Sequence, residues 1–224
     1  MKQPFLWVIL AFSFLSSCGK KENVRLAQNY YRLAMLELTD TNYSVHTYKK
    51  ALQLIDQALE YEQKPQYQAF KATLLFKLGH MVESECFFKK ALSHCTDPHV
   101  KAEIVNNYAC LLAQAKRTNE ALALWNELET NKSYLTPEVA CVNQGKLALE
   151  GKNYEKAHTH FLKALSLAPE YLDAHYYAAL TAYQLHDRSF AYNEVKTILF
   201  LEPKHEGAQK LGQVLGGISL SDQV

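Results

Sequence analysis

The side chains best suited to metal or acid–base chemistry gather in one short stretch near the middle of the 224-residue chain. The stretch holds two histidines, a cysteine and an aspartate: His94, Cys95, Asp97 and His99. These are zinc-ligand types, but a structural zinc site needs four well-placed ligands, and no second cluster elsewhere completes this one. Pro98 interrupts the stretch, which favours a polar loop between helices. We therefore expect no metal site.

The chain has four cysteines beyond position 18: Cys86, Cys95, Cys110 and Cys141. An even number permits disulfides if the protein works in an oxidising compartment. Cys86 and Cys95 stand nine residues apart on or just past one expected helix, which is too far for a bond unless the end of that helix unwinds. We expect buried or half-buried thiols that pack like small apolar side chains, and we leave their pairing open.

The sequence does not supply the machinery of an enzyme. It lacks the H-E-x-x-H, G-x-S-x-G and phosphate-binding glycine-loop motifs, and its carboxylates are scattered along the chain. The 24 Lys and Arg residues nearly balance the 23 Asp and Glu residues, and nothing suggests nucleic-acid binding. We expect a protein that is not an enzyme and that takes no cofactor, no nucleic acid and no small-molecule substrate.

The N-terminus combines a positive charge, an apolar run and a cysteine. Lys2 precedes the apolar run 5–15, which is too short to span a bilayer as a stable helix but has the layout of a secretory signal peptide. The letters L-S-S-C at 15–18 resemble the lipobox of bacterial lipoproteins. The resemblance implies cleavage before Cys18 and acylation of its sulfur and of its new amino group. Several acyl chains anchor a protein firmly, whereas a single chain binds only marginally.

These features divide the N-terminal part of the chain. Residues 1–17 are expected to form the lipoprotein signal peptide, and residues 18–26 a lipidated tether. Gly19 stands where an Asp tends to retain bacterial lipoproteins in the inner membrane. The resemblance therefore implies the outer membrane, with the protein facing the periplasm. Lys20 and Lys21 either contact anionic head groups, at about 1 kcal/mol each, or belong to a solvated tether.

The rest of the chain repeats one pattern of residue types every 34 positions. Pro169 and Pro203 close two copies of it. Small or apolar residues recur in register at the eighth, twentieth and twenty-seventh positions of these copies: Gly145 with Ala179, Ala157 with Ala191, and Ala164 with Ile198. This period is the signature of the tetratricopeptide repeat, a pair of helices that stacks on its neighbours because it cannot bury its apolar face alone.

Three earlier copies follow the same register. A second unit occupies 65–98, and a third begins near 102 with a final turn two residues longer than usual. The first unit, around 30–58, has about five extra residues within 39–44, between its two helices. Gly79 and Gly151 fall where short loops reverse the chain inside the second and fourth units.

The sequence therefore predicts an all-α fold, a right-handed tetratricopeptide-repeat solenoid of about five helical hairpins. We place this domain at 27–215, with a capping helix near 204–215 and a flexible tail at 216–224. The small residues let the two helices of each hairpin approach closely where they cross, and larger apolar residues fill the spaces between hairpins.

Repeats of this kind bind other proteins on the concave face formed by the first helix of each hairpin. Positions two, five, nine and twelve face that groove, and the set is largely apolar: Gln66, Ala69, Thr73, Phe76, Glu103, Asn106, Cys110, Ala113, Val139, Val142, Lys146, Leu149, Asp173, Tyr176, Leu180 and Tyr183. Nine of them are expected to contact a partner: Phe76, Asn106, Cys110, Val142, Lys146, Leu149, Tyr176, Leu180 and Tyr183.

Aromatic side chains dominate interface energies, so Phe76, Tyr176 and Tyr183 are the expected anchors of the groove. Asn106 and Lys146 are expected to set the register of the partner through hydrogen bonds. An amphipathic helix or an extended apolar segment suits such a surface. Some members of the set are expected to pack on the neighbouring helix instead.

The middle of the chain carries more specific motifs. V-N-N-Y-A-C-L-L at 105–112 opens the third unit, Y-L-T-P-E follows at 134–138, and N-Q-G stands at 143–145. Together with the lipobox, these motifs resemble the tetratricopeptide lipoproteins of type IV pilus biogenesis, the pilotins of the pilus secretin. The resemblance covers most of 65–205. The chain departs from the family at Ala109, where members have Gly.

The resemblance implies a scaffold that is not an enzyme. Family members sit on the periplasmic face of the outer membrane, where they help the secretin subunit reach that membrane and form its ring. The alternative is another tetratricopeptide lipoprotein, such as an adaptor for cell-wall hydrolases or for an envelope assembly complex. Neighbouring genes for a pilus and secretin, or for wall synthesis, would separate these two functions.

Overall fold

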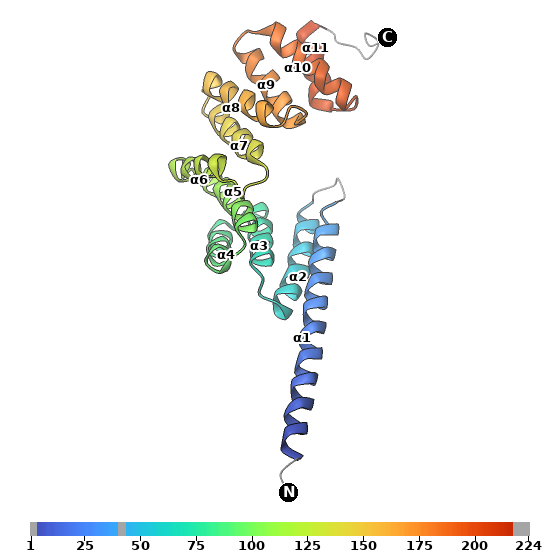
Figure 1. Cartoon of the computed structure of the whole chain (residues 1–224). Coiled ribbons are helices and arrows are strands. Elements are labelled where there is room, and N and C mark those ends of the chain that lie inside the picture. The colour runs from blue at the N-terminus through green and yellow to red at the C-terminus, as the bar shows by residue number, and fades with distance from the viewer. Residues whose placement is uncertain (1–3, 40–43, 217–224) are drawn as a thin grey trace. The chain divides into compact units, whose positions relative to one another are not determined.

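The computed structural model describes residues 4–39 and 44–216, with side chains from residue 20 onward. Over these residues the chain forms helices and no strand, as the sequence predicts (Figure 1). The helices are α1 (Pro4–Leu36), α2 (Val45–Tyr61), α3 (Pro65–Lys77), α4 (Met81–His94), α5 (Pro98–Gln114), α6 (Thr118–Thr130), α7 (Pro137–Glu150), α8 (Tyr154–Leu167), α9 (Leu172–Gln184), α10 (Arg188–Leu201) and α11 (Glu206–Gly216).

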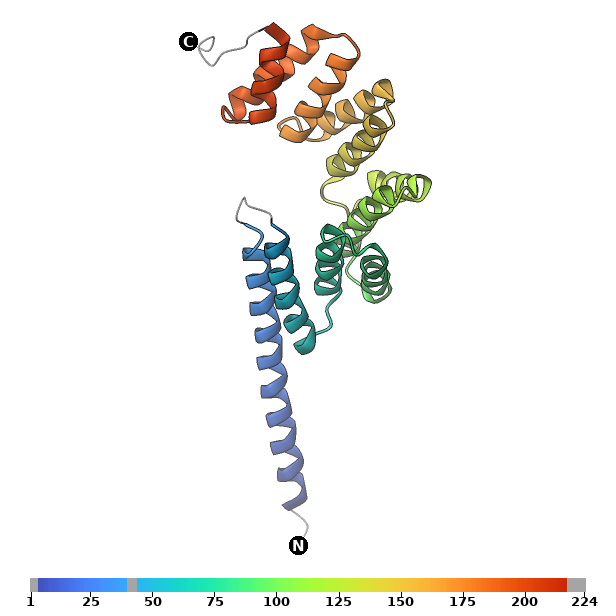
Figure 2. The same ribbon diagram turned by 180° about the vertical axis from the view of Figure 1, so that it is seen from behind.

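The helices form two compact units, residues 1–111 and 112–224, with the border inside α5. In the first unit α1 packs against α2, α2 against α3, and α3 against α4. In the second unit each helix from α6 to α11 packs against the next. There α7 also contacts α9, and α9 contacts α11, so the first helices of successive hairpins touch (Figures 1 and 2).

The predicted repeat register is confirmed by burial. Small residues at the eighth and twentieth positions of every hairpin are shielded from solvent, and so are the residues at the twenty-seventh. The set is Ala34, Ala51, Ala58, Ala72, Ser84, Ala91, Ala109, Ala121, Leu128, Gly145, Ala157, Ala164, Ala179, Ala191 and Ile198. The Ser84 hydroxyl donates to the carbonyl of Ala72 at 2.6 Å, which joins the eighth and twentieth positions of one hairpin directly.

Four of the hairpins turn in the same way. In each of them the second residue after the first helix adopts a left-handed φ, and the N–H groups of this residue and of the next one donate the two backbone hydrogen bonds of a Schellman motif. The left-handed residues are Gly79, Lys116, Lys152 and His186, with φ of 84°, 62°, 57° and 64°. In the fourth hairpin the strained residue is thus Lys152 and not Gly151, whose φ is −76°.

Loop lengths follow the sequence prediction. The hairpins from α3 to α10 turn within three residues, whereas the connection between α1 and α2 runs from 37 to 44. Within that longer connection, residues 40–43 lie outside the described residues. Between hairpins, the connection from α6 to α7 is longer than the other described ones, as predicted for the third unit.

The proposed tether 18–26 is helical, because α1 continues from Pro4 to Leu36 without a break. The side chain of Cys18 and the tail beyond Gly216 lie outside the described residues. In the described part of the chain, no helix has the length and the apolar character needed to cross a membrane.

Candidate protein-binding surfaces

The nine residues expected to contact a partner fall in both units. Phe76, Asn106 and Cys110 belong to the first unit. The other six lie on α7 and α9 in the second. Asn106 is 6% exposed and Val142 is 1% exposed, so these two offer little surface to a partner. The other seven are half-buried.

The first unit has a pocket of about 290 Å³ at its predicted groove positions. Gln66, Ala69 and Thr73 of α3 line it together with Glu103 of α5, and all four hold positions that the repeat assigns to the concave face. The complete lining is Tyr31, Gln66, Ala69, Phe70, Thr73, Val100, Glu103, Ile104 and Asn107.

The pocket has an aromatic wall and a polar rim. The rings of Tyr31 and Phe70 meet edge to face with centroids 5.4 Å apart, and Val100 and Ile104 add aliphatic surface. Burial, with a smaller effect of the neighbouring Tyr67, raises the pKa of Tyr31, so its hydroxyl stays protonated. The volume is at the lower end of ligand pockets, about 300–1,000 Å³. The pocket therefore suits one or two apolar side chains of a protein partner.

In the second unit the predicted polar anchor already has partners. The Nζ of Lys146 lies 3.1 Å from a carboxylate oxygen of Asp173 on α9, and 4.5 Å from the ring centroid of Tyr177. Tyr177 itself stacks on the buried ring of Phe161. Lys146 thus joins α7 to α9, and a partner would have to share it with Asp173.

The predicted aromatic anchors of the second unit pack against a cluster formed by α9, α10 and α11. Tyr176, Leu180 and Tyr183 lie against a cluster that includes Ala208 and Leu211 of α11. A Cβ atom at Gly207 would stand 2.8 Å from the Tyr176 ring, so the missing side chain of Gly207 makes room for that ring. Much of this aromatic surface therefore stabilises the last hairpin.

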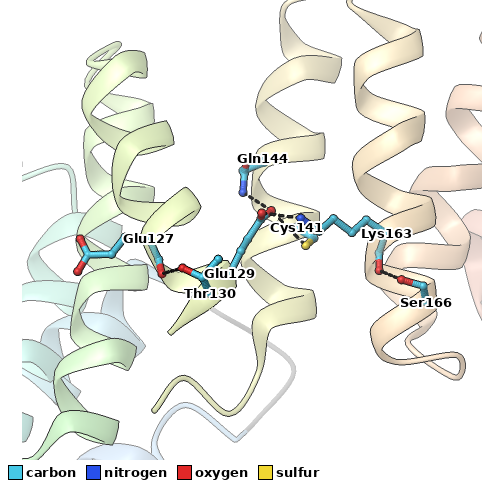
Figure 3. Close-up of polar contacts among 7 residues, drawn as sticks. All are labelled: Glu127, Glu129, Thr130, Cys141, Gln144, Lys163 and Ser166. Carbon is cyan, nitrogen blue, oxygen red and sulfur yellow. Dashed lines mark hydrogen bonds and ion pairs between the residues drawn. The ribbon is translucent and has the colours of Figure 1, made fainter. Parts of the chain in front are cut away.

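A network of side chains around Glu129 joins three helices of the second unit (Figure 3). One carboxylate oxygen of Glu129 in α6 lies 2.6 Å from the Nζ of Lys163 in α8. The other accepts from Gln144 Nε2 at 2.8 Å and from the Cys141 thiol at 3.4 Å, both in α7. Because all three donors converge on a carboxylate whose side chain is 14% exposed, the network fixes α6, α7 and α8 together.

The electrostatics of this network are those of a structural site. Burial alone would raise the pKa of Glu129, but the hydrogen bonds from Lys163, Cys141 and Gln144 outweigh it, and the pKa lies below its usual value. Burial and the adjacent carboxylate raise the pKa of Cys141 to about 12. The Cys141 thiol is therefore protonated at neutral pH and serves as a donor rather than as a nucleophile.

The stretch that first suggested metal chemistry caps helices. The Asp97 carboxylate accepts from the backbone N–H groups of His99 and Val100 at the start of α5, at 2.9 and 3.2 Å. The His94 ring lies 2.9 Å from the Lys90 carbonyl at the end of α4. Among the described residues, no three His, Cys, Asp or Glu side chains are arranged to hold a metal ion.

No family model matches the chain, and no curated protein matches its sequence. Solved structures do resemble it. PilW, described as a widely conserved type IV pilus biogenesis factor, aligns with a TM-score of 0.68 at 22% identity over 84% of each chain. Pseudomonas aeruginosa PilF aligns with 0.68 at 20% identity, over 88% of this chain and 84% of PilF.

A tetratricopeptide protein of Thermus thermophilus, TTC0263, aligns with a TM-score of 0.65 at 17% identity, over 84% of this chain and 98% of its own. At these identities the likeness shows the fold, which is that of tetratricopeptide repeats, as the 34-residue period predicts. Proteins of this fold bind other proteins on the surface of their stacked hairpins. The fold thus indicates a protein-interaction scaffold.

Proposed function

We propose that the protein is an outer-membrane lipoprotein scaffold that binds the subunit of the type IV pilus secretin and promotes its localisation and ring assembly. The observation that carries the proposal is the agreement of two independent likenesses. The motifs at 105–112, 134–138 and 143–145 resemble the pilotin family, and the backbone resembles PilW and PilF over at least 84% of each chain.

The pocket of the first unit is the proposed contact for the secretin subunit. Its aromatic wall of Tyr31 and Phe70 accepts an apolar side chain, and the polar rim bonds to the partner's backbone. A membrane-bound subunit in transit exposes apolar surface that would otherwise aggregate. Covering part of that surface until the ring forms requires no chemistry, only an open apolar pocket held near the membrane.

Acylation of Cys18 is the proposed means of holding the protein there. The acyl chains keep it at the outer membrane, facing the periplasm. Replacing Cys18 with Ser removes the sulfur that is to be acylated, so the variant should take up no labelled palmitate and should leave the membrane fraction. Continued labelling of the Cys18→Ser variant would contradict the anchor.

A deletion strain tests the function. We expect the ratio of secretin multimer to monomer in outer-membrane fractions to fall without this protein and to recover with the wild-type gene. Asn107→Trp, which places a large side chain over the pocket, should not restore the ratio. Gln57→Trp, on the exposed side of α2, should restore it.

The outcomes separate the proposal from its alternative. A normal multimer ratio in the deletion strain would contradict a pilotin function and favour an adaptor for cell-wall hydrolases or an envelope assembly complex. Full recovery with Asn107→Trp would show that the protein acts on the secretin through another surface.

A further inference from the structure

One face of α1 carries a row of long basic and polar side chains. Lys21, Arg25, Gln28 and Arg32 are separated by four, three and four residues, which places them on one side of a helix with 3.6 residues per turn. All four are exposed. We call this set the basic face of α1.

Packing on the opposite side holds this face outward. Ala27 and Ala34 are completely buried, and Tyr30 stacks on Tyr61 of α2 with ring centroids 5.9 Å apart. The rings of Tyr31 and of Tyr67 in α3 lie with their centroids 4.8 Å apart. Because α2 and α3 grip the same side of α1, the helix cannot rotate its basic face inward without losing these contacts.

The charges of this face are not neutralised within the described part of the chain. Lys21, Arg25 and Arg32 form no ion pair or hydrogen bond there with a side chain or backbone group. Elsewhere in the first unit, by contrast, lysines are paired with carboxylates: Lys50 with Glu37, Lys64 with Glu62, Lys71 with Asp56 and Lys89 with Glu85. The only acidic residue among positions 20–36 is Glu22.

Two apolar side chains flank this side of the helix near its end. Met35 and Leu36 lie within about 60° of the basic face around the helix axis, and they are 46% and 60% exposed. Basic residues with adjoining exposed apolar ones are the composition of helices that lie in the interface of a membrane.

We propose that the basic face of α1 rests on an anionic phospholipid surface, so that α1 lies along the membrane that holds the anchor. The inference rests on the proposed acylation of Cys18, which brings the helix to the bilayer. Charge complementarity selects the lipid: Lys21, Arg25 and Arg32 match phosphate groups, and the neighbouring Leu36 enters the edge of the acyl region.

The length of the helix distinguishes a lying from a standing arrangement. At 1.5 Å per residue, Lys21 is about 5 Å and Arg32 about 20 Å from Cys18 along α1. Charges act on a surface over about 8 Å at physiological salt. If α1 stood upright, only Lys20 and Lys21 would sense the lipid charge, whereas a lying helix engages Arg25 and Arg32 as well. Lying α1 would hold the first unit close to the bilayer.

Fluorescence of the acylated protein tests this arrangement. Gln28→Trp places a tryptophan in the middle of the basic face, and Gln53→Trp places one on the exposed side of α2. The native Trp125 is buried in the second unit and supplies a constant background. The proteins are inserted into vesicles of brominated phosphatidylcholine with or without brominated phosphatidylglycerol, because bromine quenches tryptophan at the interface.

We expect the emission of Gln28→Trp to be quenched in the anionic vesicles, because an interfacial helix lies about 5–10 Å into the head-group boundary. The quenching should weaken in high salt or without the anionic lipid, and Gln53→Trp should show little of it. Into the Gln28→Trp protein we then introduce Lys21→Gln, Arg25→Gln and Arg32→Gln together. Each cation near an anionic surface favours the bound state about fivefold, so the ratio of α1 on the surface to α1 away from it should fall about 100-fold.

Equal quenching of Gln28→Trp and Gln53→Trp would overturn the proposal, as would quenching that ignores lipid charge and the three substitutions. An absence of quenching in protein that still floats with the vesicles would also overturn it and would leave the face to a protein partner. Failure to float with the vesicles would instead refute acylation at Cys18, and with it the premise of this arrangement.

Discussion

The inner surfaces of the two units differ in what fills them. In the first unit, positions on α3 and α5 line an open pocket, with Tyr31 and Phe70 forming its wall. In the second unit, the equivalent positions on α7 and α9 are occupied by the protein itself. Lys146 is paired with Asp173, and Tyr176 packs over Gly207 of α11.

This difference shows that one repeat pattern produces an open pocket in one unit and a packed surface in the other. The positions are the same in each unit, and the side chains that pack against them decide their role. Because Tyr176 and Tyr183 of α9 pack against a cluster of buried residues from α9, α10 and α11, that part of the surface contributes to stability. We therefore propose that the first unit binds the partner and that the groove positions of the second unit serve stability.

The largest expected effect tests the structural role of the second unit. A Cβ atom at Gly145 would stand 2.5 Å from the buried ring of Phe161, so Gly145→Leu should lower the free energy of unfolding by about 1–3 kcal/mol. Thermal and urea melts measure this. Asn126→Leu, exposed on α6, should change it by less than about 0.5 kcal/mol. Equal melts for the two variants would refute the close crossing of α7 and α8.

A smaller effect is expected where α11 covers α9. In Gly207→Val, the new side chain overlaps the Tyr176 ring, which is half-buried and has some room to swing outward. The expected loss is about 1 kcal/mol, at the lower end of overpacking costs. The double variant with Tyr176→Ala should show coupling, because the clash disappears with the ring. Additive losses would mean that Tyr176 does not lie over Gly207.

The last hairpin should be sensitive to pH through His175. Its Nδ1 lies 2.5 Å from Glu194, and its Nε2 lies 2.8 Å from the Pro169 carbonyl. Both nitrogens face acceptors, and both can donate at the same time only when the ring is protonated. The hydrogen bond to Glu194 raises the pKa of His175 against the opposing effect of burial, with help from the Pro169 carbonyl.

A raised folded-state pKa fixes the sign of that dependence. The stabilisation from His175 is complete below the unfolded value, near 6.5, and is lost as the pH rises through the higher folded value. Denaturation of the wild type and of His175→Gln at a series of pH values should therefore show curves that converge toward alkaline pH. A difference that grows with rising pH would contradict the assignment.

The smallest effect concerns the hairpin turns, where the first unit uses Gly79 and the second uses Lys152 and His186. A left-handed conformation costs a residue with a Cβ about 1–2 kcal/mol, partly offset by the greater freedom of glycine in the unfolded chain. Lys152→Gly should thus stabilise the protein by about 0.5–1 kcal/mol in urea melts. Gly79→Lys, which meets open space, should destabilise it by a similar amount.

The sequence predicts the helices and their crossings well, because the small residues at each crossing recur with a fixed period. The pocket was only half predictable. Thr73 and Glu103 hold groove positions, and so does Tyr31, which is position five of the first unit when Ala34 is position eight; Phe70 and Asn107 hold position six and enter the pocket from outside the predicted groove set. Position counting considers each hairpin by itself and cannot show which neighbouring side chain enters its groove.

Other features depend on tertiary contacts that a repeat pattern does not encode. The sequence alone predicts that Glu129 is one of many carboxylates on solvated helix surfaces. In the structure, Lys163, Gln144 and Cys141 converge on its carboxylate. Tyr176 was expected to be a binding anchor because it is large and faces the groove. Gly207, which lies two helices later in the chain but against the Tyr176 ring in space, leaves room for that ring to be half-buried.

Site-specific photo-crosslinking tests the central claim most directly, because it samples both surfaces in living cells. A photoreactive phenylalanine in place of Phe76, which is half-buried one turn beyond Thr73 on α3, reports on the groove of the first unit without covering the pocket, and one at Tyr183 reports on the second unit. We expect an adduct between the secretin subunit and position 76, with little or none from position 183. An adduct from position 183 alone would contradict it and would return binding to the second unit.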